Sequence, residues 1–256
     1  MSKAKGLPQS GYEPIFDPRD YSVIGFNCYD YAIGYQDKRN NKVAHNSKSA
    51  PGDRARISNK LNVTKCSDLR TGILKDNPKA VKVCKDPKKV CGRGYFKIMS
   101  FVSPGVRGNT ADFHFYRQVQ SVRYKIATGD TVSSLAKYFR VTPAVIREAA
   151  KKLKQPTNNV DGNINSNSNL SNRVLATNRL RANNKKSVLT PGKIIEFKCN
   201  LWAHKQGWGT RPILVDAKGK TIYDPRKANR NYGSLNYTKL CGVYCIRAGK
   251  AKSGNS

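Results

Sequence analysis

The sequence contains no run of 18 apolar residues, so we expect no segment that crosses a membrane as an apolar helix. Its first residues, 1–8, are polar and contain no apolar h-region, so we expect no secretory signal peptide and synthesis in the cytoplasm. Acidic residues and histidine are scarce, with 16 Asp and Glu against 48 Lys and Arg, and three histidines. Few side chains are therefore candidates for acid–base chemistry.

The charge balance points to an anionic neighbour. The formal net charge is +32, and the basic residues are spread from Lys3 to Lys252 rather than gathered in a tail. Such a field attracts an acidic glycan, a membrane or nucleic acid without sequence preference. The sequence has no nucleic-acid reader motif and no basic helix with base-contacting spacing, so recognition of a particular nucleotide sequence is not expected.

Seven cysteines form an odd set. The pairs Cys84/Cys91 and Cys241/Cys245 lack zinc-knuckle spacing and have no histidine nearby, so we expect no metal site and no cofactor. Buried thiols are the default expectation in a reducing compartment. If the protein leaves the cell by lysis or packaging, one disulfide between these close pairs is an option.

Local patterns predict a succession of helices and strands. Residues 1–20, with three prolines, indicate an extended or disordered arm. Helical spacing or capping predicts helices that begin at residues 28, 66, 132 and 143, and Asn77-Pro78 ends the second of them. Alternation predicts a hairpin of residues 94–102 and 111–117. Strands are further expected at 200–205 and 240–246, a hairpin at 213–224, and a disordered tail over 248–256.

One cysteine, Cys28, lies in a sequence context typical of a nucleophile. In Gly25-Phe26-Asn27-Cys28-Tyr29-Asp30-Tyr31-Ala32 the thiol of Cys28 stands at a predicted helix start. The helix dipole and unpaired N–H groups there favour a thiolate, and a thiolate with an imidazole is a nucleophile–base pair for acyl transfer. The competing interpretation is that Cys28 is an ordinary buried thiol.

The histidines differ in their surroundings. His45 lies in the basic stretch 36–60 with no apolar frame, so we expect a solvated loop residue. In the second strand of the hairpin, His114 shares a face with Asp112 and Tyr116, which would orient its ring. His204 lies in the predicted strand 200–205. His114 and His204 are therefore the candidate partners of Cys28.

Residues 123–198 resemble a lysin-motif (LysM) domain. The resemblance rests on Tyr124-x-Ile126-x-x-Gly129-Asp130-Thr131-Val132-x-x-Leu135-Ala136, on Thr142 and on Leu189-x-Pro191-Gly192-x-x-Ile195. The family has a βααβ fold and binds glycans that contain N-acetylglucosamine. The departure is an Asn-rich insertion at about 155–172, which leaves open whether 142–154 or 170–180 is the second helix. Carried over, the glycan groove would involve Gly129, Asp130, Thr131, Val132, Leu189, Thr190 and Pro191.

The flanking segments resemble a papain-like cysteine hydrolase of the group that includes bacterial cell-wall endopeptidases and amidases. The motifs are Asn27-Cys28-Tyr29-Asp30, Asp112-Phe113-His114-Phe115-Tyr116, Trp202-Ala203-His204-Lys205, Asp224-Pro225 and Cys241-Gly242. The resemblance implies Cys28 as nucleophile and His114 as base. His204 would orient His114, with Asp216 or Asp224 as substitutes. Two N–H groups at the start of the Cys28 helix would form the oxyanion hole.

Together these resemblances imply an α+β protein with a divided domain. Residues 21–121 and 199–247 would form the papain-like part, and 122–198 the inserted LysM domain. The first function this implies is a LysM-targeted cysteine peptidase or amidase that acts on peptidoglycan or similar material after delivery by lysis or a virion. The second is a non-enzymatic, basic structural protein of a virion, of minor-capsid type, which bridges capsid proteins, membrane or genome. Similar domains occur in bacteria and in large DNA viruses.

Overall fold

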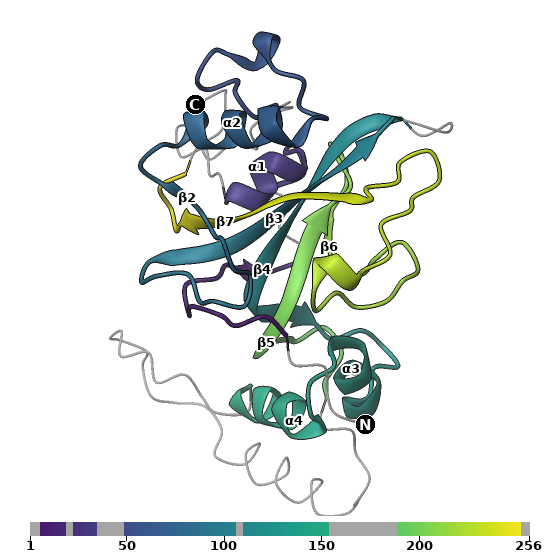
Figure 1. Cartoon of the computed structure of the whole chain (residues 1–256). Coiled ribbons are helices and arrows are strands. Elements are labelled where there is room, and N and C mark those ends of the chain that lie inside the picture. The colour runs from purple at the N-terminus through teal and green to yellow at the C-terminus, as the bar shows by residue number, and fades with distance from the viewer. Residues whose placement is uncertain (1–5, 19–22, 35–48, 106–109, 154–188, 252–256) are drawn as a thin grey trace, which may run out of the picture. The chain divides into compact units, whose positions relative to one another are not determined.

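The computed structural model describes residues 6–18, 23–34, 49–105, 110–153 and 189–251. The chain divides into two compact units, one made of residues 1–124 and 198–256 and the other of residues 125–197. The expected α+β class is confirmed, because a seven-stranded, mainly antiparallel sheet is combined with a few helices (Figure 1). Within the described residues, no helix has the length and apolar character needed to cross a membrane.

The strands follow the order β2-β7-β3-β4-β5-β6, and β1 pairs in parallel with β4. Segments far apart in the sequence therefore become neighbours in the sheet. The bounds are β1 Ile15–Phe16, β2 Val81–Val83, β3 Tyr95–Pro104, β4 Ala111–Lys125, β5 Ile194–Lys205, β6 Pro212–Ile213 and β7 Lys239–Arg247.

The predicted hairpin is confirmed by β3 and β4. They pair antiparallel from Ile98 opposite Arg117 to Pro104 opposite Ala111. Alternating aromatic and β-branched residues favour such strands because each face of the pleat carries every second side chain. The alternation places His114 and Tyr116 on one face of β4, and Phe113, Phe115 and Arg117 on the other.

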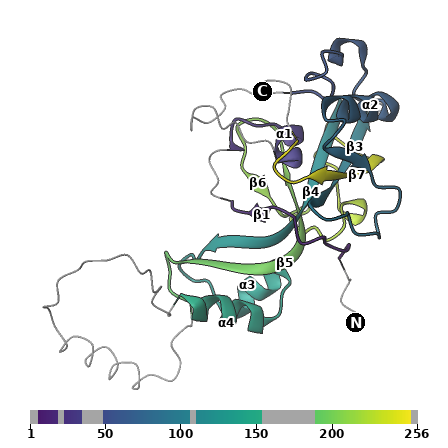
Figure 2. The same cartoon turned by 90° about the vertical axis from the view of Figure 1, so that its left-hand side faces the viewer.

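Helices α1 (Cys28–Ile33) and α2 (Cys66–Asp76) lie side by side against the sheet (Figures 1 and 2). The carboxylate of Asp76, at the end of α2, accepts a hydrogen bond of 2.9 Å from the hydroxyl of Tyr29 in α1. The same carboxylate accepts the amides of Gly52 and Ala55, so one buried group ties α1, α2 and the segment before α2 together. The predicted helix over 66–77 is confirmed within one residue.

The last strand holds two disulfides. β7 lies between β2 and β3, and it bonds through Cys241 to Cys66 at the start of α2 and through Cys245 to Cys91. The bond between Cys91 and Cys245 joins the two close sequence pairs, which is the option the sequence left open, whereas the bond between Cys66 and Cys241 was not expected. Cys241 and Cys245 are four residues apart on one extended strand, which separates them by roughly 13 Å, beyond the reach of a disulfide.

The N-terminal arm is part of the fold over its described residues. Leu7 and Phe16 are buried, and the carbonyl of Leu7 accepts the side-chain amide of Gln118 at 2.7 Å. The side-chain amide of Gln9 bridges the carbonyls of Val119 and Cys199, at 2.7 and 2.9 Å. Of the two alternatives for the arm, extended or disordered, residues 6–18 follow the extended one, because their polar groups complete bonds to β4 and β5.

Two further expectations concern the C-terminal part. The predicted hairpin at 213–224 is present in short form: Val215 bridges to Thr221, the Ile222 amide bonds to the Leu214 carbonyl at 2.9 Å, and the Asp216 amide bonds to the Lys220 carbonyl at 2.8 Å. Ile213 of β6 also pairs with His204. After β7, the Ala248 amide bonds to the Gly94 carbonyl at 2.9 Å and Ala251 is buried. The described part of the expected disordered tail, 248–251, therefore contacts the fold, and 252–256 lies outside the described residues.

The smaller unit contains α3 (Val132–Phe139) and α4 (Pro143–Lys152), which pack together (Figure 2). The side chain of Thr131 caps α3 and forms a reciprocal capping box with Ser134. Phe139 of α3 contacts Phe197 of β5 with ring centroids 5.0 Å apart. The helix at 142–154 is therefore present, whereas the Asn-rich segment and residues 170–180 lie outside the described residues.

The disulfide to α2 gives a stability prediction. Replacing both partners, in Cys66→Ser/Cys241→Ser, should lower the free energy of unfolding by about 2–4 kcal/mol, because the bond constrains a loop of 175 residues in the unfolded chain. Urea unfolding without reductant measures the difference. In the presence of a strong reductant the two proteins should unfold alike, and equal midpoints without reductant would contradict the assignment.

Candidate active site

Cys28 is the first residue of α1, as expected. Asn27 caps the helix: its side-chain oxygen accepts the amides of Tyr29 at 2.9 Å and Asp30 at 3.0 Å, while Asp30 accepts the Asn27 amide at 3.3 Å. The Asn27 side chain in turn donates to the Ser49 carbonyl at 2.7 Å. The amides of Tyr29 and Asp30 are thus bonded to Asn27 in this conformation, so an oxyanion hole at the start of the helix could use these two N–H groups only after the cap opens.

The thiol of Cys28 is enclosed. It is 6% exposed, and its sulfur donates to the Phe113 carbonyl of β4 at 3.8 Å. Burial raises the pKa of the Cys28 thiol, and the negative charges of Asp112 and Asp30 raise it further. The expected activation to a thiolate is therefore absent from this conformation, because desolvation outweighs the favourable end of a short helix.

The structure brings His114 and His204 into direct contact. Nε2 of His114 lies 2.8 Å from Nδ1 of His204 across β4 and β5, and Nε2 of His204 lies 2.8 Å from the carbonyl oxygen of Val215. A carbonyl only accepts, so Nε2 of His204 carries the proton and its Nδ1 has a lone pair. His114 must then donate from Nε2, which leaves its own Nδ1 as the basic nitrogen.

Both imidazoles are neutral. His114 is 3% exposed and His204 fully buried. Burial holds the pKa of His114 well below its usual value, and the neighbouring His204 lowers it further. Burial also lowers the pKa of His204 to about 4, although its bond to Val215 and the charge of Asp216 oppose the shift. A neutral His114 is the form that can accept a proton from a thiol.

Tyrosines surround the histidine pair. The ring of Tyr237 stacks on His114 with centroids 4.9 Å apart, and its hydroxyl donates to Asp112 at 2.7 Å. Tyr116 lies 5.0 Å from His114 and 4.8 Å from His204, and Tyr232 completes the group at 6.4 and 6.1 Å. Asp112, predicted to orient His114 directly, acts instead through Tyr237.

The thiol and the histidine pair meet the same stretch of β4 without a bond between them. Cys28 contacts the carbonyl of residue 113, directly before His114. Among the residues that the structure describes, neither His114 nor His204 forms a hydrogen bond with the Cys28 sulfur. Helix α1 follows the other face of β4, where Tyr29 contacts Phe115.

A cation fixes the far end of α1. The guanidinium of Arg117 lies 3.6 Å from the centre of the Tyr31 ring and donates to the Tyr31 carbonyl at 2.8 Å. A positive group at the last carbonyls of a helix is favourable. Because Arg117 and His114 belong to the same strand, this contact fixes α1 relative to the histidine pair.

The two candidate orienting carboxylates serve other groups. Asp216 accepts the amides of Lys218, Lys220 and Asn229, each at 2.9 Å, and Asp224 pairs with Arg226 at 2.6 Å. They were expected only as substitutes for His204, and His204 itself contacts His114; the ring of His204 is in turn held by a backbone carbonyl, that of Val215. A carbonyl leaves no signal in a sequence, so this partner could not be found from side-chain types.

The residues proposed for a glycan groove lie in two neighbouring turns of the smaller unit. The amide of Ile126 bonds to the Lys193 carbonyl, and the amide of Gly192 to the Ile126 carbonyl, both at 2.8 Å. These bonds bring together the turn before α3 and the turn before β5. The first holds Gly129, Asp130, Thr131 and Val132, and the second Leu189, Thr190 and Pro191. Leu189 is buried, whereas Gly129, Thr131, Thr190 and Pro191 are exposed.

The remaining sequence candidates add no further site. His45 lies outside the described residues. Within the described part of the chain, no three His, Cys, Asp or Glu side chains gather where they could hold a metal ion.

Comparison with known proteins gave no match to a family model, to a curated protein or to a solved structure.

The buried histidines give a pH prediction. The unfolded rings take up protons near pH 6.5, whereas the folded rings resist protonation until a lower pH. Their contribution to stability is therefore complete above pH 6.5 and is lost as the pH falls toward 4, by up to about 1.4 kcal/mol per pH unit for each ring.

Urea unfolding between pH 7.5 and 4.5 measures this slope. The double variant His114→Gln/His204→Gln should show a shallower loss of stability on acidification than the natural chain, whatever its stability at pH 7.5. Parallel curves for the two proteins would show that the rings are not held neutral by the fold.

Proposed function

We propose that this protein is a LysM-targeted, papain-like cysteine hydrolase that cuts amide bonds in peptidoglycan or similar glycan-linked material. The observation that carries the proposal is the 2.8 Å hydrogen bond between His114 and His204. It gives His114 one defined tautomer, with a basic Nδ1, on the strand whose backbone contacts the thiol of Cys28. The order nucleophile, base and orienting residue is that implied by the resemblance to papain-like hydrolases.

The chemistry assigned to these residues is acyl transfer. The Cys28 thiol would leave the Phe113 carbonyl and pass its proton to Nδ1 of His114, and the sulfur would attack the amide carbonyl. The protonated His114, stabilised by its bond to His204, would then give the proton to the leaving amine. Water would release the acyl group from Cys28. Since the thiol is neutral and not bonded to His114 at rest, substrate binding must bring the two groups together.

The smaller unit supplies the targeting. Its strand–helix–helix–strand order and the two bonded turns at residues 126–132 and 189–193 support a groove for N-acetylglucosamine-containing glycan. The net charge of +32 adds non-specific attraction to acidic glycans or other anionic surfaces. The two disulfides favour a destination outside a reducing compartment, which delivery by lysis or in a virion would provide.

Release of amines from purified peptidoglycan tests the chemistry. Cys28→Ala should reduce the release by about 1,000-fold or more, because the nucleophile is lost. Cys199→Ala is the matched control, since Cys199 is also a buried free thiol of raised pKa that bonds to a backbone carbonyl, but that carbonyl belongs to Val119 and not to the residue before His114. Equal release by the natural chain and Cys28→Ala would contradict hydrolysis by this thiol.

Binding to chitin oligosaccharides tests the targeting. Thr190→Lys places a long charged side chain in the exposed turn before β5 and should weaken binding about tenfold or more, as measured by titration calorimetry. Thr142→Lys is the matched control, because Thr142 is exposed in the same unit and its side chain makes no capping bond to α4. Unchanged affinity in Thr190→Lys would place the glycan elsewhere.

One observation favours a second function, that of a non-enzymatic structural protein. Cys28 is enclosed, its thiol is neutral, and α1 contacts the face of β4 opposite to His114. In this function the same folds would bridge capsid proteins, membrane or genome, and the positively charged surface would bind the anionic partner. Binding to peptidoglycan or anionic vesicles that falls steeply with salt, without amine release by the natural chain, would favour it.

A further inference from the structure

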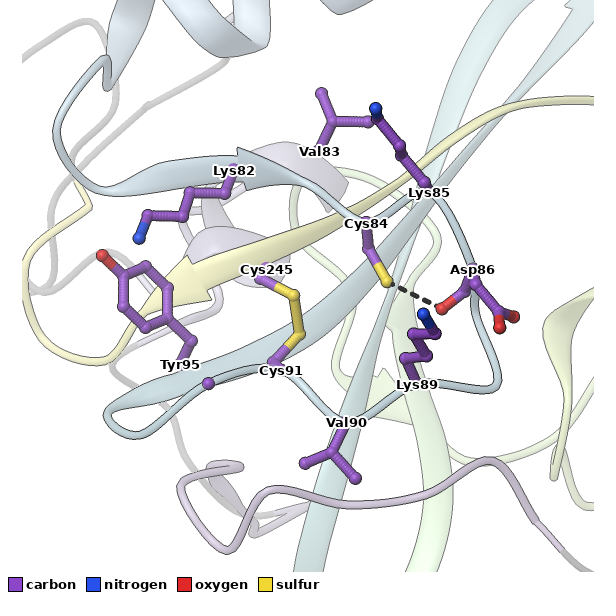
Figure 3. A pocket seen from close by; sticks show the side chains of 11 residues that line it. Lys82, Val83, Cys84, Lys85, Asp86, Lys89, Val90, Cys91, Tyr95 and Cys245 are labelled. Atoms are coloured by element: carbon purple, nitrogen blue, oxygen red, sulfur yellow. Dashed lines mark hydrogen bonds between the residues drawn. A yellow bond between two sulfur atoms is a disulfide. The ribbon is translucent and has the colours of Figure 1, made fainter.

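Three cysteines line a cavity of about 280 Å³ at one edge of the sheet (Figure 3). Its wall contains the disulfide between Cys91 and Cys245 together with the free cysteine Cys84. The remaining lining comes from β2, the segment that follows it and the start of β3. It consists of Lys82, Val83, Lys85, Asp86, Lys89, Val90, Gly92 and Tyr95.

Strand pairing places Cys84 and Cys245 on the same face. Lys82 of β2 lies directly opposite Cys245 of β7, and the amide of Cys84 bonds to the Val243 carbonyl at 2.8 Å. Side chains two residues apart on a strand point to the same side, so Cys84 is the diagonal neighbour of Cys245. Cys91 reaches this face from the segment between β2 and β3.

The thiol of Cys84 is free to react. It is partly exposed, unlike the buried thiols of Cys28 and Cys199. Its one hydrogen bond that the structure describes runs to the Asp86 carbonyl at 3.1 Å. A thiol is a weak donor, so losing this bond costs little. The Cys84 sulfur is directed at the Asp86 carbonyl and the disulfide lines the same cavity (Figure 3), so an approach of the two requires the Cys84 side chain to rotate away from Asp86.

We propose that this cavity is a site of internal thiol–disulfide exchange, in which Cys84 displaces Cys245 from Cys91. The Cys84 thiolate bonds to the Cys91 sulfur, the bond between Cys91 and Cys245 breaks, and its electron pair leaves on Cys245. Cys245 takes up the proton that Cys84 gave to solvent. One disulfide and one thiol are present before and after, so the step needs no oxidant or reductant. The proposal is independent of any activity at Cys28.

Geometry selects Cys91 as the sulfur that is attacked. Cys84 and Cys245 belong to paired strands, whose ladder holds diagonal neighbours roughly 7–8 Å apart, beyond the usual reach of a disulfide. Cys91 belongs to the connection between strands, where a turn closes through the Lys89 amide and the Asp86 carbonyl at 3.0 Å. That connection can move toward Cys84 without breaking the sheet.

Exchange changes which two segments of the chain the disulfide joins. The bond between Cys91 and Cys245 spans 154 residues, whereas a bond between Cys84 and Cys91 spans 91 − 84 = 7. A shorter loop constrains the unfolded chain less, so the exchanged form should be less stable. Before exchange the disulfide joins β7 to the segment after β2. After exchange both bonded cysteines belong to that segment, and β7 is no longer joined to it.

Peptide mapping after alkylation tests the proposal directly. The full-length protein is incubated at pH 8.5 without added thiol, quenched with N-ethylmaleimide so that every free thiol is blocked, and digested with trypsin at about pH 6.5, where exchange is slow. Trypsin separates the relevant cysteines, since Cys84 falls in Val83–Lys85, Cys91 in Val90–Arg93 and Cys245 in Leu240–Arg247. The variant Cys84→Ser removes the attacking sulfur, and Cys199→Ser is the matched control.

The expected result is a peptide that joins Val83–Lys85 to Val90–Arg93, with maleimide on Cys245. It should grow with time, form faster at pH 8.5 than at pH 6.5 because the thiolate is the attacking species, and persist in Cys199→Ser. It should be absent from Cys84→Ser. Full labelling of Cys84 with an intact bond between Cys91 and Cys245, or a bond between Cys84 and Cys245, would overturn the proposal.

Discussion

The hydrogen bond between the buried rings of His114 and His204 is the constraint on which the candidate site depends. Two imidazoles enclosed by tyrosines are stable there only if both are neutral and each polar nitrogen has a suitable partner. The Val215 carbonyl satisfies the outer nitrogen of His204 and thereby sets the direction of the bond between the rings. This requires β4 and β5, which lie on either side of residues 126–193 in the chain, to be neighbours in one sheet.

Contacts with the same sheet also fix the position of the Cys28 thiol. Helix α1 is fixed at its start by the Asn27 cap and at its end by Arg117, so the Cys28 sulfur is pressed against the backbone of β4. The cap occupies the amides of Tyr29 and Asp30, and burial keeps the thiol protonated. Both proposed functions start from this resting arrangement, a histidine with a defined lone pair and a neutral, enclosed thiol.

Local elements of this fold were predictable because their signals lie within a few residues. Alternation around His114 predicted β4 and the face that the ring occupies, and Asn77-Pro78 marked the end of α2. The long-range features were not predictable. Cys66 meets Cys241 only because β7 enters between β2 and β3, which no local pattern specifies. The partner of His204 is a main-chain atom of Val215, and Tyr237 meets His114 from a loop without periodicity.

Nitrogen-15 NMR of the histidine side chains tests the central claim most directly, because the chemical shifts report which ring nitrogen carries the proton. At pH 7 the account predicts that His114 and His204 are both neutral with the proton on Nε2, and that His204→Gln changes the signals of His114. The signals can be assigned by comparison with His45→Gln and His204→Gln. A charged ring at either position, or a proton on Nδ1 of His204, would contradict the account.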